Sequence, residues 1–193
     1  MNLAAARAIT TGYMHDDELS WLAEAASRHH RIVEVGSWTG RSTRALADNT
    51  PGHVYAVDTW EGSADGDLRD ILVRHGSRWA ADEFLRNMTG TTNVIPIPLP
   101  SAQAAVSLAT FGPFDMIFID ACHEYHSVRA DILSWLPLLA PDGLLCGHDY
   151  THKDHTGVRR AVDEILGAEV ATMTPADAEH SIWWLRKICP PQT

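Results

Sequence analysis

The sequence predicts a three-layer α/β sandwich built on a mainly parallel, seven-stranded sheet. Short apolar runs typical of buried strands alternate along the chain with segments of helical periodicity. Several of these runs end in a polar residue, such as Glu34, Asp58, Asp120 and Asp149. Strands of a parallel sheet covered on both faces read as continuous apolar runs, and ligands bind outside their carboxyl ends. We therefore expect the functional groups at the carboxyl ends of the strands.

The composition is that of one globular domain, so we treat residues 1–193 as a single unit. Hydrophobic residues make up 45% of the chain, and the formal net charge of −10 argues against a general nucleic-acid surface. No apolar run reaches the roughly 18 residues of a membrane helix, and residues 1–14 lack a signal-peptide pattern. The three cysteines are too scattered for a disulfide framework or a zinc site. We expect a cytoplasmic protein with no membrane and no nucleic-acid partner.

The first 30 residues form a predicted N-terminal helical segment. Apolar residues from Leu19 to Ala26 repeat at helical spacing, and Asp16 or Asp17 can cap this helix. A strand is predicted over 32–35, a helix from about 41 to 48, and a second strand over 53–57.

The segment 59–90 is longer than a plain crossover needs, and it contains a predicted helix over 70–87. It is either a lid facing the substrate or an ordinary surface helix. The third strand, 93–99, contains three prolines, which favours an edge position in the sheet. A helix over 101–108 follows, with Ser101 as its predicted N-cap.

The second half continues the alternation of strands and helices. The sequence predicts a central strand over 115–120, a helix over 127–139, a strand over 144–149 and a helix over 157–166. The last two strands, 168–173 and 181–187, are predicted as antiparallel neighbours.

A glycine turn after the first strand predicts the ligand. Gly36 and Gly40 allow the backbone to approach a ligand closely, and a helix begins directly after them. Their spacing is not the G-x-G-x-x-G of dinucleotide folds, which argues against a nicotinamide oxidoreductase. Glu34 would repel phosphates but could accept from an ammonium group, while Asp58 could hold ribose hydroxyls. Together these features predict S-adenosylmethionine (SAM).

Three motifs in order resemble the class I SAM-dependent methyltransferases. E-V-G-S-W-T-G-R-S, from Glu34, is similar to the first motif of catechol O-methyltransferase, and Ser101-Ala-Gln103 resembles its adenine-contacting segment. I-D-A-C-H-E-Y-x-x-V-x-x-D and L-L-A-P-D-G-L-L-C-G-H-D-Y resemble the short bacterial macrocin-type and cephalosporin-biosynthesis-type O-methyltransferases. The resemblance runs from about Arg31 to Leu166 and implies a Rossmann-like methyltransferase fold.

The resemblance also implies residue roles. In the methionine pocket, Ser42 would reach the SAM carboxylate; around the nucleoside, Thr59 or Trp60 would lie against the adenine. The implied SAM-binding residues are Glu34, Gly36, Ser37, Trp38, Gly40, Ser42, Asp58, Thr59, Trp60, Ser101, Gln103 and Asp120.

A divalent metal would be held by Asp120, His148 and Asp149, at the positions where the resembled enzymes place their metal ligands. Those enzymes usually carry an acid in place of His148. Since imidazole suits Mn²⁺, Zn²⁺ or Fe²⁺ better than Mg²⁺, the choice of metal stays open. His123 is the candidate base, and His148 is the rival base if no metal binds. Two further histidines, His152 and His155, are read as surface residues, and Asp131 as a solvated or salt-bridged residue.

The predicted activity is methyl transfer from SAM to a hydroxyl of a small metabolite, such as a sugar, a phenol or a natural product. The alternatives are a metal-independent N- or C-methyltransferase and a non-catalytic SAM-binding accessory protein. The sequence leaves the acceptor open, and a homodimer is the expected assembly on general grounds.

Overall fold

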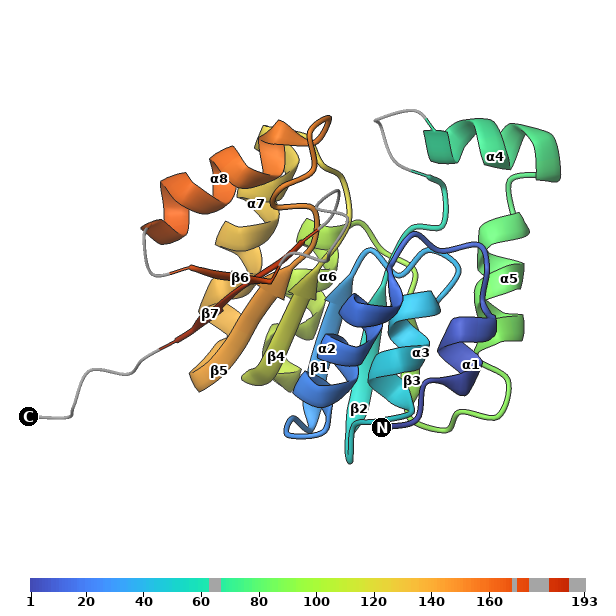
Figure 1. The fold of residues 1–193 in the computed structure, drawn as a ribbon, viewed down its shortest axis with the longest axis horizontal. Helices are drawn as coiled ribbons and strands as arrows, with labels where there is room; N and C mark the ends of the chain where they lie inside the picture. Colours follow the sequence, from blue (N-terminus) through green and yellow to red (C-terminus); the bar gives the residue numbers. More distant parts are fainter. Residues whose placement is uncertain (63–66, 168–169, 174–180, 188–193) are drawn as a thin grey trace, which may run out of the picture.

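The computed structural model describes residues 1–193 apart from 63–66, 168–169, 174–180 and 188–193. The described strands form a seven-stranded sheet in the order β3-β2-β1-β4-β5-β7-β6 (Figure 1). The first five strands of the chain pair in parallel, and β7 is antiparallel to both β5 and β6. The strands are β1 (Arg31–Val35), β2 (His53–Val57), β3 (Val94–Ile97), β4 (Phe114–Ile119), β5 (Leu139–Gly147), β6 (Ala171–Met173) and β7 (Ile182–Arg186).

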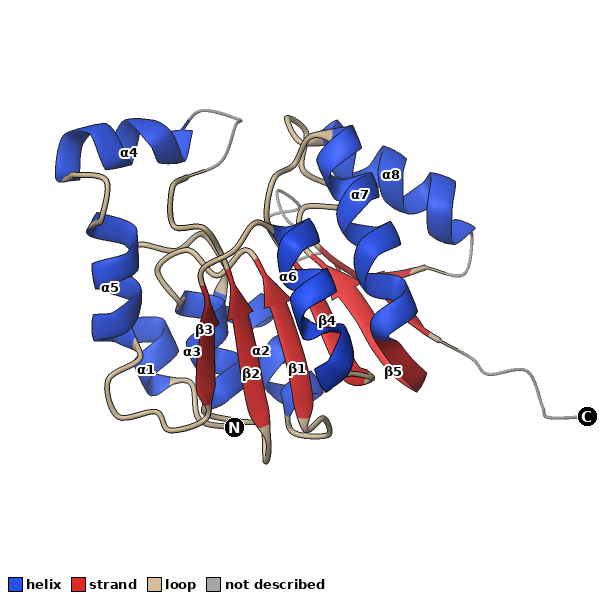
Figure 2. Cartoon of the chain, turned by 180° about the vertical axis from the view of Figure 1, so that it is seen from behind, coloured by secondary structure: helices blue, strands red, loops and turns tan. Residues whose placement is uncertain are grey.

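Helices cover both faces of the sheet. One face carries α1 (Ala4–Ala8), α2 (Asp16–Ala26) and α3 (Arg41–Ala47). The other carries α6 (Ser101–Leu108), α7 (Tyr125–Trp135) and α8 (Thr156–Leu166), as Figure 2 shows. Two short 3₁₀ turns, Ala109–Phe111 and Leu136–Leu138, follow α6 and α7. The predicted sandwich with a mainly parallel sheet is therefore confirmed.

The alternation of side chains across the central strands explains why their sequences are almost wholly apolar. Met116 and Phe118 of β4 pack under α2 and α3, whereas Ile117 and Ile119 pack under the α6–α8 layer. Phe118 is completely buried, and burial of such a side chain contributes about 1.5–3 kcal/mol. Both faces of β4 are thus core, as expected for a central parallel strand.

The predicted helix over 70–87 is wrong as a single element. It is two helices, α4 (Asp67–His75) and α5 (Trp79–Asn87), because Gly76 adopts a left-handed conformation with φ of 100° and ends the first. Phe84 of α5 packs against Trp60 with ring centroids 4.9 Å apart. In Figure 1, α4 lies above α5, beyond the β3 edge and at the level where the parallel strands finish.

The ends of the sheet largely follow the prediction. β3 is an edge strand, and the two last strands are antiparallel neighbours, although residues 168–169 lie outside the described part of the chain. The adjacent tryptophans of β7 point to opposite faces: Trp183 is buried in the α6–α8 core, and Trp184 packs on Trp21 of α2. No helix among the described residues is long and apolar enough to cross a membrane.

Candidate active site

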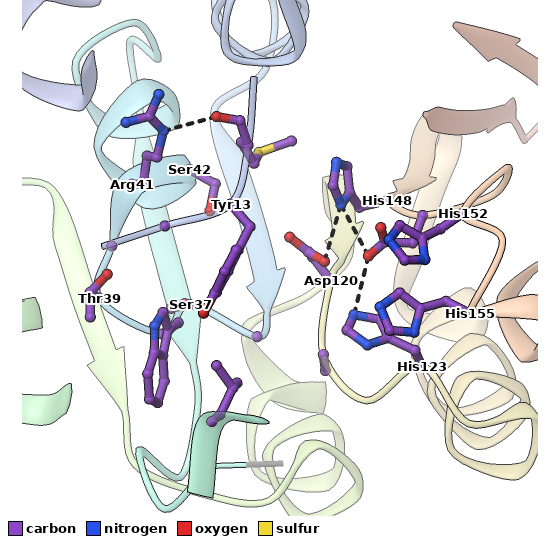
Figure 3. Close-up of a pocket in the computed structure, with 18 of the residues that line it drawn as sticks. Tyr13, Ser37, Thr39, Arg41, Ser42, Asp120, His123, His148, His152 and His155 are labelled. Atoms are coloured by element: carbon purple, nitrogen blue, oxygen red, sulfur yellow. Dashed lines mark hydrogen bonds and ion pairs between the residues drawn. The ribbon is translucent and has the colours of Figure 1, made fainter. Parts of the chain in front are cut away.

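A cavity of about 330 Å³ opens at the carboxyl ends of the strands (Figure 3). It lies between the glycine turn after β1, the ends of β4 and β5, and an N-terminal segment that includes Tyr13. Nine residues predicted from the sequence line it: Gly36, Ser37, Trp38, Gly40, Ser42, Asp120, His123, His148 and Asp149. The fold therefore brings the two halves of the predicted site, far apart in sequence, to one cavity.

Gly36 makes this convergence possible. Its φ of 93° is in the left-handed region, and a Cβ built on it would lie 2.0 Å from the backbone oxygen of Asp120. Its N–H donates to the Val57 oxygen at 2.8 Å, and the Asp120 N–H donates to the Val35 oxygen at 2.8 Å. The turn after β1 thus packs directly on the end of β4, which only glycine allows.

Glu34 lies beneath the turn and is completely buried. The hydroxyl of Ser37 donates to its Oε2 at 2.8 Å, and the hydroxyl of Thr43 donates to the same oxygen. Burial raises the pKa of Glu34 to about 7, against the lowering effect of the Ser42, Thr43 and Ser37 hydroxyls. Its Oε1 has no hydrogen-bond partner among the described residues, and the same holds for the buried Nε1 of Trp38.

Asp58 organises the turn from the end of β2. Its carboxylate accepts the backbone N–H of Trp38 at 2.8 Å and that of Trp60 at 2.7 Å. The indole of Trp60 is buried and donates to the Trp38 backbone oxygen at 2.7 Å. The predicted ribose and adenine residues Asp58, Thr59 and Trp60 therefore adjoin the glycine turn but are not part of the cavity wall.

Asp149 joins two histidines at the opposite wall. Its Oδ2 lies 3.1 Å from Nε2 of His123 and 3.1 Å from Nδ1 of His148. Nδ1 of His148 is also 3.6 Å from Oδ1 of Asp120, and its Nε2 is 2.9 Å from Oε1 of Glu18. The result is a continuous chain of acids and imidazoles from α2 to the loop after β4.

The charges in this chain depend on one another. Burial disfavours the charged form of His148, but the carboxylates of Asp120 and Asp149 outweigh it and hold the pKa of His148 well above its ordinary value. The pKa of Asp120 is raised chiefly by burial, although the neighbouring His148 lowers it. The raised pKa of His148 favours the charged form of its ring beside these two acids.

The structure corrects the prediction that His152 and His155 are surface residues, since both are half-buried. Both line the cavity, and the rings of His123 and His155 stack with centroids 3.9 Å apart, while those of His155 and His152 are 4.1 Å apart. Their presence among five histidines between positions 123 and 155 was the sequence signal for this cluster.

Within the described part of the chain, two groups of side chains could hold a metal ion: Asp120 with His148 and Asp149, and His123 with Asp149 and His155. In each group the ligand atoms lie within 4.8 Å of one another. The rings of His123 and His155 are nearly parallel, at 28°. Imidazole lone pairs lie in the ring plane, so these two do not converge on one ion. The first group, which contains the predicted ligands, has the better geometry.

The N-terminal segment supplies residues of the site that sequence reasoning did not single out. Gly12, Tyr13 and Met14 line the cavity, and Figure 3 shows Tyr13 between the glycine turn and the histidine cluster. Arg41 of α3 holds this segment by donating to the backbone oxygens of Met14, at 3.0 Å, and Ile9. No motif marks these residues, because their role depends on where the chain returns to α3.

Ser101 has a structural role instead of the predicted cap. Pro100 is the N-cap of α6, while the Ser101 hydroxyl donates to Asp131 at 2.5 Å and accepts from Nε1 of Trp135 at 2.9 Å. The prediction that Asp131 is solvated or salt-bridged is wrong, since it is buried, and burial raises its pKa to about 6. Gln103 is exposed on α6, away from the cavity wall.

Comparisons with known proteins agree with this architecture. A family model described as a methyltransferase domain matches residues 33–150, which spans the glycine turn and the strand ends that carry Asp58, Asp120 and Asp149. A curated relative, the uncharacterized protein y4gI of Sinorhizobium fredii, is 27% identical over 145 residues. That match covers 70% of this chain but only 14% of the relative's length.

Solved structures with low sequence identity share the fold. An O-methyltransferase candidate from Klebsiella pneumoniae aligns with a TM-score of 0.71 at 19% identity, covering 97% of this chain and 88% of the other. TomG of Streptomyces achromogenes, an O-methyltransferase of tomaymycin synthesis solved with SAM, gives 0.64 at 16%, with 96% and 87% covered. An rRNA methylase from Streptococcus thermophilus gives 0.64 at 16%, with 93% and 99% covered. The chain therefore belongs to the methyltransferase-domain family and has the fold of the class I SAM-dependent methyltransferases.

Proposed function

We propose that this protein transfers a methyl group from SAM to a hydroxyl of a small metabolite, such as a sugar, a phenol or a natural product, with the assistance of a divalent metal. The observation that carries the proposal is the cavity itself. It places the glycine turn of the family's SAM motif opposite a cluster of two carboxylates and several imidazoles. Such a cluster serves an acceptor that must lose a proton.

The turn has the chemistry that SAM requires. The partnerless Oε1 of Glu34 is an acceptor suited to an ammonium group, and the partnerless Nε1 of Trp38 is a donor at the cavity wall. Both are buried, and a buried polar group without a partner is costly unless a ligand supplies one. A zwitterionic ligand at the glycine turn would supply an acceptor to Nε1 of Trp38, while Glu34 lies beneath the turn and is not part of the cavity wall.

The wall formed by Asp120, His148 and Asp149 fits a divalent metal. It offers two carboxylate oxygens and one imidazole nitrogen within 4.8 Å. Because one donor is a nitrogen, the set suits Mn²⁺, Zn²⁺ or Fe²⁺ better than Mg²⁺. A metal held there would supply a Lewis acid that lowers the pKa of the acceptor hydroxyl.

The methyl transfer itself needs alignment and one proton acceptor. The acceptor oxygen forms a bond to the methyl carbon while the carbon–sulfur bond of SAM breaks, and S-adenosylhomocysteine leaves. The hydroxyl proton passes to His123, whose Nε2 lies 3.1 Å from Oδ2 of Asp149, a carboxylate that stabilises the imidazolium that forms. His148 is less suited to this role, since both of its ring nitrogens face carboxylates.

A metal-independent methyltransferase is the second candidate, and one observation favours it. His148 lies between Asp120 and Asp149 at 3.6 Å and 3.1 Å, and its raised pKa favours a positive charge at this position without a metal. In that case His123, supported by Asp149, would act without a metal on a hydroxyl, nitrogen or carbon acceptor. The small-molecule acceptor, the homodimer and the cytoplasmic location stay predictions.

The deciding experiment is calorimetric titration of SAM and of Mn²⁺, Zn²⁺ and Mg²⁺ into chelator-treated protein. Asp149→Asn is the test variant, and Asp154→Asn is the matched control, because Asp154 lines the cavity but belongs to neither donor group. We expect SAM binding in all three proteins and metal binding that weakens at least tenfold only in Asp149→Asn.

Turnover with a panel of hydroxylated acceptors completes the test. Full turnover in the presence of EDTA would exclude the metal and support the second candidate. Absence of SAM binding by the unmodified protein would contradict both candidates, because both depend on the glycine turn.

A further inference from the structure

A buried carboxylate far from the motifs contacts the site from below. Glu18 lies on α2 and is completely buried, and its Oε1 lies 2.9 Å from Nε2 of His148. The His148 side chain is 3% exposed, so this pair is closed to solvent. The two residues are 130 positions apart in sequence, and neither the family motifs nor the predicted ligands include Glu18.

Both oxygens of Glu18 are used. Oε2 accepts the backbone N–H of His15 at 2.8 Å, which completes a capping box at the start of α2, while Oε1 faces His148. The side chain is therefore fixed at one end by a helix terminus. Leu22, one turn further along the same helix face, is also completely buried, so Glu18 occupies a position of the apolar face where a hydrophobic residue would fit.

A buried carboxylate at such a position is costly, and replacing a buried ion pair by apolar residues is often neutral or stabilising. A contribution to stability is therefore a weak explanation for a glutamate at position 18. Its effect on His148 gives a stronger one: with Nε2–H donated to Glu18, the other nitrogen, Nδ1, is turned toward Asp149 at 3.1 Å and Asp120 at 3.6 Å.

We infer that Glu18 is a positioning residue of the active site: it accepts from Nε2 of His148 and so fixes the ring orientation in which Nδ1 faces Asp120 and Asp149. The inference rests on the proposed function in that a metal held by this wall would take Nδ1 as its nitrogen ligand. A carboxylate behind a ligating histidine is a general device for fixing the tautomer and raising the basicity of the ligand.

The inference also gives α2 a functional task. The helix that begins at Asp16 follows the N-terminal segment that walls the cavity, so Glu18 and Tyr13 reach the site from one stretch of chain. The N-terminal segment would then contribute to the reaction centre as well as to the acceptor pocket.

Two variants test this inference, with a control on the same helix. Glu18→Met removes the acceptor at similar length, and Glu18→Gln keeps one acceptor but loses the charge. Glu24→Gln is the matched control, because Glu24 is an exposed residue of α2 whose bonded partner is Arg28. Circular dichroism and thermal unfolding establish first that each variant is folded.

The primary measurement is the long-range ¹H–¹⁵N spectrum of histidine-labelled protein, assigned with His148→Asn. We expect a protected proton on Nε2 of His148 in the unmodified protein and in Glu24→Gln, and its loss or large shift in Glu18→Met. An unprotonated Nε2 in the unmodified protein, or unchanged His148 signals in folded Glu18→Met, would overturn the inference.

The second measurement is titration with Co²⁺, whose visible spectrum reports nitrogen and oxygen ligands. We expect Glu18→Met and Glu18→Gln to weaken Co²⁺ binding by about 10–100-fold, with little change in SAM affinity. In a His148→Asn background Glu18→Met should have no further effect, since Glu18 acts through His148. An equal effect in both backgrounds would contradict the inference. If the unmodified protein binds no Co²⁺, the metal part of the proposed function is wrong, and the histidine spectrum still decides the role of Glu18.

Discussion

Gly36 shows how one residue can set the geometry of the whole site. Its left-handed φ is one penalty for any other residue, and the 2.0 Å separation between an added Cβ and the Asp120 oxygen is a second. Gly76 is a natural control, because its φ is 100° but nothing lies within 4 Å of its Cβ position. We expect Gly76→Ala to cost about 1–2 kcal/mol from backbone strain alone.

Gly36→Ala should cost more, roughly 2–5 kcal/mol, because overpacking adds to the strain. It should also weaken SAM binding by at least tenfold, since the end of β4 must move away from the turn. Urea unfolding and SAM titration of the two variants measure both effects. Equal destabilisation of the two proteins would show that the contact with Asp120 is unimportant.

Glu34 gives the protein without ligand a predictable dependence on pH. Its pKa is raised to about 7 in the fold from 4.5, so between these values the folded state binds more protons than the unfolded state. Stability contributed by protonated Glu34 is therefore present at low pH and is lost as pH rises from about 4.5 to about 7.

Glu34→Gln should flatten this part of the stability curve, because its amide does not titrate. The unfolding free energy of the variant relative to the unmodified protein should rise between pH 5 and pH 7.5 by an amount on the order of 1–3 kcal/mol. Urea unfolding at both pH values, without SAM, provides the comparison. Parallel curves for the two proteins would mean that Glu34 does not titrate in this range.

The residues that could be predicted from sequence are those that follow an apolar strand directly. Asp120, His148 and Asp149 stand at the ends of strands, where the topology dictates their convergence. His155 could not be placed in this way, because its position depends on how the loop after β5 folds back to stack on His123. The prediction that Ser101 caps its helix was wrong for a related reason. Its hydroxyl bonds Asp131, a tertiary contact that the local sequence does not indicate.

At the scale of elements, the N-terminal segment depends on one side chain of α3. Arg41 donates to the backbone oxygens of Met14, at 3.0 Å, and Ile9. Arg44, on the same helix, instead forms an ion pair with Asp48 at 2.9 Å. The two arginine side chains are similarly buried, at 14% and 16% exposure. They form a matched pair for testing the attachment of the segment.

Arg41→Met should release the segment and speed chymotrypsin cleavage after Tyr13 by tenfold or more, because cleavage requires local opening of the backbone. Arg44→Met should leave this rate within about twofold even if it lowers global stability by a similar 1–3 kcal/mol. Mass spectrometry of timed digests identifies the cut. Equal acceleration in both variants would attribute the effect to global unfolding.

The predicted bounds of an element agreed with the structure where the sequence pattern was clear. They were wrong where a single backbone angle ends a helix. The second strand, 53–57, was predicted with its observed bounds, since turn residues flank an apolar run. The 70–87 helix was not, because α4 and α5 both carry helical periodicity and only the positive φ of Gly76 separates them. A glycine within a helical pattern can either continue the helix or end it, and its conformation depends on packing.

At the scale of the whole molecule, the site joins the two halves of the sheet. The cavity wall draws on the turn after β1, the ends of β4 and β5, and the segment before α2. A ligand that binds there holds these elements together and is lost on unfolding. Ligand binding to the native state alone must therefore raise the stability of the protein as one unit.

SAM at 100 times its dissociation constant should stabilise the fold by about 2.7 kcal/mol, which corresponds to a rise in Tm of roughly 5–10 °C for a domain of this size. NAD⁺ is the informative control ligand, because it shares the adenosine of SAM but needs the close glycine pair that the E-x-G-x-x-x-G turn lacks. Differential scanning calorimetry with each ligand measures the shifts. A comparable shift with NAD⁺ would mean that the adenosine alone is recognised, whereas a shift confined to SAM would locate the selectivity at the methionine end of the ligand, which we propose lies at the glycine turn between Gly36 and Ser42.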